Sequence, residues 1–304
     1  MNVIPQLIFD AVSLGGIYAM AALGIALIFG VMKLVNFAHG EYIAFCVFAL
    51  IIPSTDAVAV LFLGKAPAIV LVPVLLLIGA VLAVISEIVV FRKFRNATPV
   101  SMMIASFALG FVIQNVLLLL YSSRPKAVSL WPELNQPVTL FGASIPLLQL
   151  IVICVTLVVV VVLAVFLKRT RIGLEMRAAA EDFTMARLLG VRANVVIGGA
   201  FALSGMLAAS VALIMVTQAG VADIRMGGQI MLVAFIATVI GGLGSLPGAV
   251  VAGFLIGATS VILQAVLPLE ARPFRDAFLY GLVIVTLLLK PEGLFASSSK
   301  STRV

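Results

Sequence analysis

The residue types best suited to proton or solute chemistry lie together in the run Asn-Phe-Ala-His-Gly-Glu at residues 36–41. It holds the only histidine of the chain, His39, two positions before Glu41. In an apolar setting, an imidazole and a carboxylate can relay protons or contact a polar solute. Polar side chains before a short apolar run usually cap a helix, however, and one histidine cannot form a relay alone. We therefore favour capping and packing for Asn36, His39 and Glu41, with a relay or a substrate contact as the alternative.

Patterns typical of catalysis or metal binding are missing from the sequence. The only Gly-Lys pair, Gly64-Lys65, is followed by Ala66, so there is no phosphate-binding loop. His-Glu-x-x-His and Gly-x-Ser-x-Gly do not occur either. Cys46 and Cys154 lie far apart within apolar stretches and predict neither a disulfide nor a metal site. We expect no catalytic residue, metal or cofactor in this chain.

The composition indicates what surrounds the protein. Of its 304 residues, 63% are hydrophobic and only 10% are charged, and the mean hydropathy is +1.30. Soluble domains are about 45–50% apolar and about 25% charged. Most of the outer surface must therefore face lipid, which predicts a polytopic membrane protein. The net charge of +7 could suggest nucleic acid, but the basic residues form short clusters between apolar runs, as topology determinants do, so we expect no nucleic-acid binding.

The apolar runs predict an all-α fold, since a crossing helix needs about 20 apolar residues. The clear spans are Leu7–Val31, Ala68–Phe91, Val100–Tyr121, Pro146–Leu167 and Val195–Thr217. Shorter candidates are Asn36–Ile52, two short spans within Gln229–Leu267 broken at the glycine-rich residues 241–248, and Ala277–Leu289. We expect about eight or nine transmembrane helices in a single domain over residues 1–304, with the short ones re-entrant or packed against neighbours.

The basic residues predict the direction of the spans. If residues 92–95 and 168–192 are cytoplasmic, thirteen of the nineteen Lys and Arg lie on that side, among them Lys300 and Arg303 of the tail. The N-terminus is then outside and the C-terminus cytoplasmic. Residues 122–145 become the longest external loop.

Few ionisable residues lie within the spans. Asp10 stands near one end, Glu41 opens a short run, and Glu87 is close enough to Arg92 to reach the same interface. A proton- or sodium-coupled carrier would carry more charge at mid-membrane. The sequence therefore favours a pathway whose energy is supplied elsewhere.

The polar segment 168–192 carries its own helix. Residues from Leu174 to Leu189 are good helix formers, Arg177 and Glu181 form a pair one turn apart, and Gly190 is placed as a C-cap. We predict one helix from residue 174 to residue 189.

An apolar stripe on that helix favours docking. Phe183, Ala186 and Leu189 have nothing in the segment to cover them. The prediction is a docking helix for a soluble cytoplasmic partner. The alternative is a plain surface helix whose positive charge fixes the topology.

Glycines and a weak internal sequence repeat suggest how the helices pack. Gly253 and Gly257 stand four apart, a spacing that allows helix backbones to approach closely. Residues 40–45 open the second span and residues 228–233 the seventh with similar sequences. Five spans separate them, so they would face opposite ways, as inverted repeats do.

Several segments together resemble the LivH-type permease of branched-chain amino acid ABC transporters, in the right order over almost the whole chain. They are residues 36–41, the pattern of small and charged residues in 173–191, the glycine-rich 241–249, Arg275-Asp276, and 290–295 (Lys-Pro-Glu-Gly-Leu-Phe). The resemblance implies a multi-pass subunit of the bacterial inner membrane that moves branched-chain or related amino acids by alternating access.

The resemblance also implies partners. They are a second permease of LivM type, two cytoplasmic ATPases that bind ATP and Mg²⁺, and an external solute-binding protein, for which Trp131, Pro132 and Glu133 in the external loop offer a surface. Residues 168–192 would couple to the ATPase, with Gly173, Arg177, Glu181, Phe183, Ala186, Leu189 and Gly190 as the coupling residues. Candidate pathway or gate residues are Asn36, His39, Glu41, Gly241, Gly242 and Gly244. The chain departs from the Glu-Ala-Ala motif of many importers, with Arg177-Ala178-Ala179-Ala180 in its place.

Three alternatives stay open. The same architecture could move another solute, such as urea, short amides or an aromatic acid, because the binding protein largely selects the solute. A self-sufficient channel or facilitator would transport alone and would give the segment 168–192 no purpose. An integral-membrane enzyme would need a cluster of Asp, Glu or His at one interface.

Overall fold

The computed structural model describes residues 3–95, 97–140, 143–291 and 293–295. Lys300 and Arg303, which we count as cytoplasmic, and Glu292 of the family likeness lie outside the described residues. The helices are α1 (Val3–Met32), α2 (His39–Phe48), α3 (Ala68–Val89), α4 (Pro99–Tyr121), α5 (Leu147–Arg169), α6 (Arg171–Glu181), α7 (Phe183–Leu188), α8 (Ala193–Ala219), α9 (Met226–Gly241), α10 (Leu246–Val266) and α11 (Arg275–Leu289). Single turns of 3-10 helix are η1 (Leu63–Lys65), η2 (Phe91–Phe94), η3 (Pro132–Asn135) and η4 (Arg272–Phe274), and the strands are β1 (Lys126–Ala127), β2 (Pro137–Leu140), β3 (Ala143–Pro146) and β4 (Val221–Ala222).

Within the part of the chain that the structure describes, six helices are long and apolar enough to cross a membrane. They are Ile4–Met32, Ala68–Phe94, Pro99–Tyr121, Leu147–Arg169, Ala193–Ala219 and Leu246–Val266. Each clear span predicted from the sequence coincides with one of them. The predicted break at residues 241–248 separates α9 from α10, but α10 is a 21-residue helix and not a short span. The all-α class is confirmed, while the number of crossings and their direction stay predictions.

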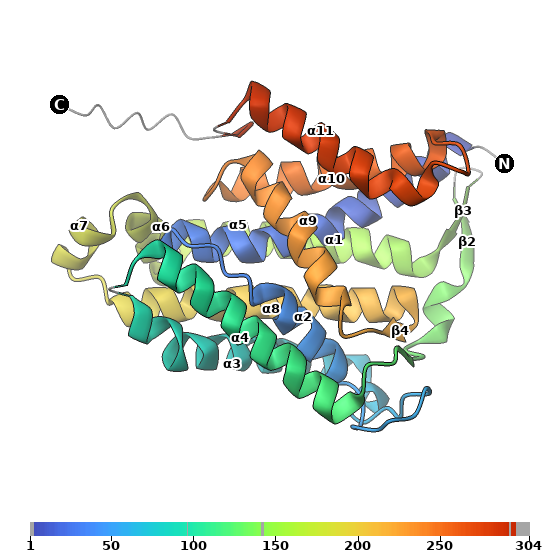
Figure 1. The fold of residues 1–304 in the computed structure, drawn as a ribbon, viewed down its shortest axis with the longest axis horizontal. Helices are drawn as coiled ribbons and strands as arrows, with labels where there is room; N and C mark the ends of the chain where they lie inside the picture. The colour runs from blue at the N-terminus through green and yellow to red at the C-terminus, as the bar shows by residue number, and fades with distance from the viewer. Residues whose placement is uncertain (1–2, 96, 141–142, 292, 296–304) are drawn as a thin grey trace.

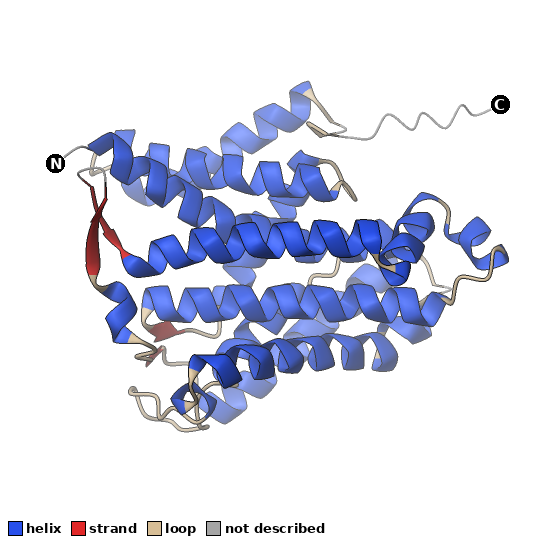
Figure 2. Ribbon diagram, turned by 180° about the vertical axis from the view of Figure 1, so that it is seen from behind, coloured by secondary structure: helices blue, strands red, loops and turns tan. Residues whose placement is uncertain are grey.

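Several of the long helices, α5, α8 and α10 among them, lie side by side along the long axis of the molecule, whereas α4, α9 and α11 run obliquely to it (Figure 1). The central helix is α1, which packs against α10, α8, α9 and α5 and is almost fully buried from Ile17 to Val31. In contrast, α3, α4 and α5 expose apolar side chains along much of their length, as helices that face lipid do. The β2–β3 hairpin and the α6–α7 segment lie at opposite ends of the bundle (Figure 2).

Small residues let α10 lie directly on α1. A Cβ at Gly253 would lie 2.5 Å from the Cα of Ala19, and one at Gly257 would collide with the backbone of Gly15. The two helices therefore touch through their backbones over a full turn, as the spacing of the two glycines predicts.

The two segments of the internal sequence repeat, residues 40–45 and 228–233, lie against each other in the structure. At the first turn of each helix, Gly40 of α2 and Gly227 of α9 pack backbone against backbone, with no room for a Cβ at either position. The helices α2 and α9 therefore cross where the similar sequences begin. Their relation as inverted repeats stays a prediction.

Candidate functional site

The segment 168–192 folds into two helices, so the prediction of one continuous helix is wrong. The chain breaks at Asp182, whose backbone is extended (φ −144°, ψ 105°). Its carboxylate accepts hydrogen bonds from the N–H groups of Thr184 at 2.8 Å and Met185 at 3.0 Å, and so caps the start of α7. An aspartate that satisfies free N–H groups in this way competes with the continuation of a helix.

Glycines shape both ends of the segment, as the sequence predicts for Gly190 alone. Gly190 adopts φ +91°, and the N–H of Val191 donates to the carbonyl of Ala186 at 3.1 Å. This left-handed termination confirms Gly190 as the residue that ends α7. At the other end, a Cβ on Gly173 would lie 2.5 Å from the Cα of Leu167, so this glycine lets α6 fold back against the end of α5.

The predicted apolar stripe is divided between the protein and the solvent. Phe183 is half-buried and Ala186 is buried, whereas Leu189 is 86% exposed. Successive residues of a helix turn by about 100°, so the third member of an i, i+3, i+6 series points well away from the first. Leu189 instead joins the exposed side chains of Met185 and Leu188, which the sequence interpretation missed.

Helix α6 faces the turn between α9 and α10 across a groove. Arg177 and Glu181 are exposed and, within the described residues, form no ion pair with each other, so the predicted pair is not made. Instead, both line a groove of about 260 Å³ whose opposite wall is the end of α1 and residues 244–247. The structure thus brings coupling candidates and a gate candidate, Gly244, to one groove.

The gate candidates Gly241, Gly242 and Gly244 form this tight turn. Gly242 and Gly244 have φ values of +95° and +87°, which other residues rarely adopt. Gly241 packs against the backbone of Gly248, and the hydroxyl of Ser245 accepts the N–H of Gly248 at 3.2 Å to cap α10. The glycines therefore hold the end of α9 against the start of α10.

The polar run at residues 36–41 is buried, and its side chains mostly pack. The side-chain oxygen Oδ1 of Asn36 accepts the N–H of Ala38 at 3.1 Å, just before α2. His39 does not cap the helix, because its Nδ1 pairs with the hydroxyl of Ser204 in α8 at 3.0 Å. Among the described residues, its buried Nε2 has no hydrogen-bond partner. The contact with Ser204 joins positions too distant for any local sequence signal.

Glu41 does not cap α2 either, and it lies beside α4. Its side chain packs against Gly110, and its buried Oε2 has no partner among the described residues. The half-exposed Gln114 and Asn115 lie one turn further along α4, and Gln229 is exposed at the start of α9. The ring of Phe37 bridges these two helices.

Aromatic contacts define that bridge. The centroid of the Phe37 ring is 4.1 Å from that of Phe107 in α4 and 5.6 Å from that of Phe235 in α9. The short helix α2 is therefore held between α4 and α9.

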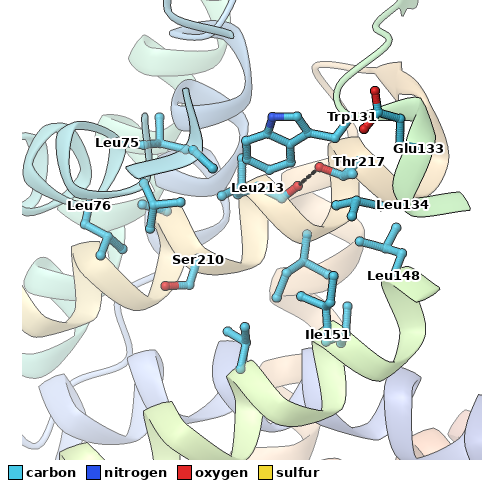
Figure 3. Close-up of a pocket in the computed structure, with 16 residues that line it drawn as sticks. Leu75, Leu76, Trp131, Glu133, Leu134, Leu148, Ile151, Ser210, Leu213 and Thr217 are labelled. Carbon is cyan, nitrogen blue, oxygen red and sulfur yellow. Dashed lines mark hydrogen bonds between the residues drawn. The ribbon is translucent and has the colours of Figure 1, made fainter. Parts of the chain in front are cut away.

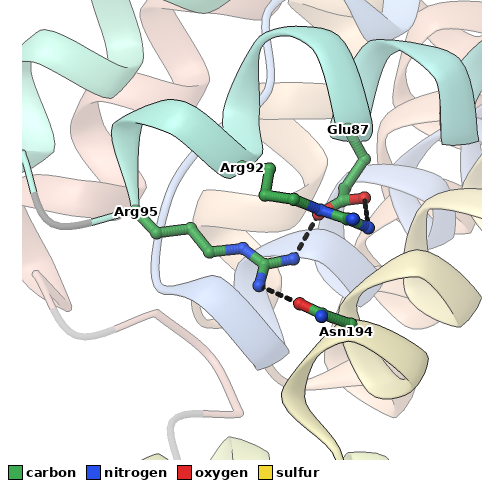
Figure 4. A network of polar contacts seen from close by, with 4 residues as sticks. All are labelled: Glu87, Arg92, Arg95 and Asn194. Carbon is green, nitrogen blue, oxygen red and sulfur yellow. Dashed lines mark hydrogen bonds and ion pairs between the residues drawn. The ribbon is translucent and has the colours of Figure 1, made fainter.

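An ion cluster ties α3 to the start of α8 (Figure 4). Glu87 is fully buried and pairs at 2.9 Å with Arg92, the residue that the sequence places at the same interface. The guanidinium of Arg95 also pairs with Glu87 and donates to the Asn194 carbonyl oxygen at 2.6 Å. Sequence reasoning missed Arg95 and Asn194. The cluster anchors α8 directly after the segment 168–192.

Comparisons with known proteins agree with this architecture. Residues 7–287 match the family model described as "Branched-chain amino acid transport system / permease component". The chain is 30% identical to the high-affinity branched-chain amino acid transport system permease protein BraD of Pseudomonas aeruginosa, over 95% of this chain and 94% of the relative. It is also 30% identical, with the same coverage, to the permease protein LivH of Escherichia coli K12.

Two further likenesses are more limited. The autoinducer 2 import system permease protein LsrC of Salmonella paratyphi B is 32% identical over 44% of this chain and 40% of its own. The solved structure of PsaBC from Streptococcus pneumoniae in complex with Fab covers 94% of this chain and 92% of that chain at 13% identity, with a TM-score of 0.46. The family match and the near full-length relatives decide the assignment: the chain belongs to the family of branched-chain amino acid transport system permeases.

Proposed function

We propose that this permease carries branched-chain or related amino acids across the bacterial inner membrane as part of an ATP-driven importer, by alternating access. The main support is the near full-length similarity to two permeases of high-affinity branched-chain amino acid transport systems. The match to the autoinducer permease covers less than half of each chain and keeps a different small solute, such as urea or an amide, as the second candidate.

The exposed side chains of Met185, Leu188 and Leu189 on α7 support docking of an ATPase. They leave a cluster of apolar surface at the end of the molecule where the basic residues predict the cytoplasm. Two such ATPases would bind ATP and Mg²⁺ and supply the energy, so this chain itself needs no cofactor. A movement of α7 would displace α6, which forms one wall of the groove beside Gly244. The opposite wall, the end of α1 and the start of α10, would then move as well.

The side of α4 that lies beside α2 supports a pathway. Polar residues are costly in contact with lipid, yet Gln114 is partly exposed one turn from Gly110, against which the Glu41 side chain packs, and the buried Oε2 of Glu41 has no partner in the described chain. A second permease of LivM type that covered this side would enclose these groups between the two subunits. The chain would cross the membrane eight or nine times, with the N-terminus and the loop 122–145 outside, where a solute-binding protein would dock.

Co-purification tests the proposal. The tagged chain is expressed with its neighbouring genes and compared with a double variant, Leu188→Glu with Leu189→Glu. The control is Leu269→Glu, which adds a charge at a similarly exposed leucine (77%) near the opposite end of α10. ATPase subunits should accompany the wild type and the control and be lost from the double variant. If no ATPase accompanies any form and the lone chain transports solute in liposomes, the protein is a facilitator.

Uptake experiments test the solute. Labelled leucine taken up by cells that express the whole system should be displaced by excess isoleucine or valine. Displacement by urea or short amides, but not by these amino acids, would favour the second candidate.

A further inference from the structure

A deep apolar groove opens between α3 and α5 near the hairpin end of the bundle (Figure 3). Its floor is the last part of α8, and η3 covers its mouth. The volume is about 450 Å³, within the about 300–1,000 Å³ of typical ligand pockets. The walls are formed by apolar side chains such as Leu76 of α3 and Ile151 of α5, and the floor carries Ser210 and Thr217 of α8.

The groove walls offer no free polar group to a solute. The hydroxyl of Thr217 donates to the carbonyl of Leu213 at 2.7 Å, and that of Ser210 donates to the carbonyl of Met206 at 3.0 Å. Both hydroxyls are thus satisfied within α8. A zwitterionic amino acid would lose its hydration here without gaining hydrogen bonds, so the walls suit a hydrocarbon chain.

The position and length of the groove match one leaflet of a bilayer. On α3 it runs from Ala68 to Leu76, a rise of about 12 Å, whereas half of a hydrocarbon core measures about 15 Å. The neighbouring side chains Ile69 on α3 and Leu157 on α5 are 83% and 64% exposed, as expected where helices meet lipid. The groove therefore opens sideways into the acyl region of the leaflet at the hairpin end.

The indole of Trp131 and the carboxylate of Glu133 lie at the mouth of the groove. Trp131 turns its indole over the groove from a left-handed backbone (φ 44°), a conformation that is costly for a bulky residue. Tryptophan prefers the interface between hydrocarbon and headgroups. Glu133 beside it is the charged side chain among the lining residues, and no ion pair in the described chain includes it.

We propose that this groove binds one acyl chain of a phosphatidylethanolamine molecule, with its ammonium headgroup beside Glu133 and its ester region at Trp131. The negative charge of Glu133 favours an ammonium and disfavours an anionic headgroup such as phosphatidylglycerol. The site shares Trp131 and Glu133 with the surface that the sequence offers to a solute-binding protein, but it does not depend on the identity of the solute.

The chain has a single tryptophan, so its fluorescence reports on this site. The full chain is reconstituted in vesicles that contain a low fraction of phospholipid brominated on the acyl chain, with ethanolamine, choline or glycerol headgroups. Brominated phosphatidylethanolamine should quench Trp131 at about a threefold lower fraction than brominated phosphatidylglycerol, the size expected for one exposed charge pair. Glu133→Gln should remove this preference and retain the quenching. Equal quenching by all three lipids in the wild type would show only general contact with the bilayer and would overturn the proposal.

A matched pair of variants tests the groove itself. Ala68→Phe places a ring at the groove, whereas Ala277→Phe adds the same ring to an exposed alanine in the first turn of α11. Native mass spectrometry of the permease purified with its partner subunits should show one retained phosphatidylethanolamine fewer for Ala68→Phe than for the wild type and for Ala277→Phe. The same number of lipids in all three forms would mean that a partner helix or nothing fills the groove, and would refute the assignment.

Discussion

The cluster around Glu87 predicts the order in which variants of Glu87, Arg92 and Arg95 lose stability. The order depends on which of these charges is buried without a partner in each variant. Glu87 has no exposed side-chain surface, whereas the side chains of Arg92 and Arg95 are 39% and 21% exposed. If both arginines become alanine, the carboxylate stays buried without a partner, which costs about 3–5 kcal/mol. If Glu87 becomes glutamine, the arginines can turn to water, and we expect a loss of about 2 kcal/mol. Arg92→Ala alone leaves Glu87 paired with Arg95 and should cost about 1 kcal/mol.

The assay is the thermal midpoint of the purified chain in one detergent at one heating rate, since stability of about 1 kcal/mol corresponds to a few degrees. The control is Arg275→Ala, which removes an exposed pair with Asp276 and should change the midpoint little. The double arginine variant must be the least stable form. If it equals Arg92→Ala, the carboxylate is not held in a dry site, and the burial argument fails.

Three further changes have defined outcomes. Gly257→Leu should strongly reduce the yield of folded protein, because its side chain would enter the backbone of α1, whereas Gly281→Leu meets open space and should fold normally in size-exclusion chromatography. Gly190→Ala forces a left-handed alanine and should weaken the end of α7 by about 1–2 kcal/mol, seen as faster amide exchange there. Ser204→Ala leaves His39 with two unpaired ring nitrogens and should cost about 1–3 kcal/mol in the same thermal assay, and an unchanged midpoint would mean that His39 gains no support from Ser204.

The long spans could be predicted because hydropathy over a window depends on local composition alone. The spacing of Gly253 and Gly257 likewise predicts that α10 approaches another helix closely, but it does not predict that this helix is α1. The pair of His39 with Ser204 could not be predicted, since it joins residues 165 positions apart and depends on how α2 is held against α8.

Local signals also failed where two of them competed. Residues 174–189 read as one helix by propensity, but Asp182 is equally a strong N-cap, and the packing of α6 against α5, α1 and α8 favours the break. Arg95 was missed because the turn η2 follows α3 and returns its side chain to Glu87, outside the i, i+4 spacing of a regular helix.

The break at Asp182 divides the segment 168–192 into two helices with different surroundings. Helix α7 packs mainly against α6 and exposes its apolar side chains, so it is free to accept a partner. Helix α6 instead packs against α5, α8 and α1, and Gly173 holds it close to the end of α5. A force applied to α7 therefore reaches three long helices through one short helix. A single continuous helix would put the docking surface and the packing surface on one rigid rod, whereas the capped break lets α7 be oriented independently of the face that α6 buries.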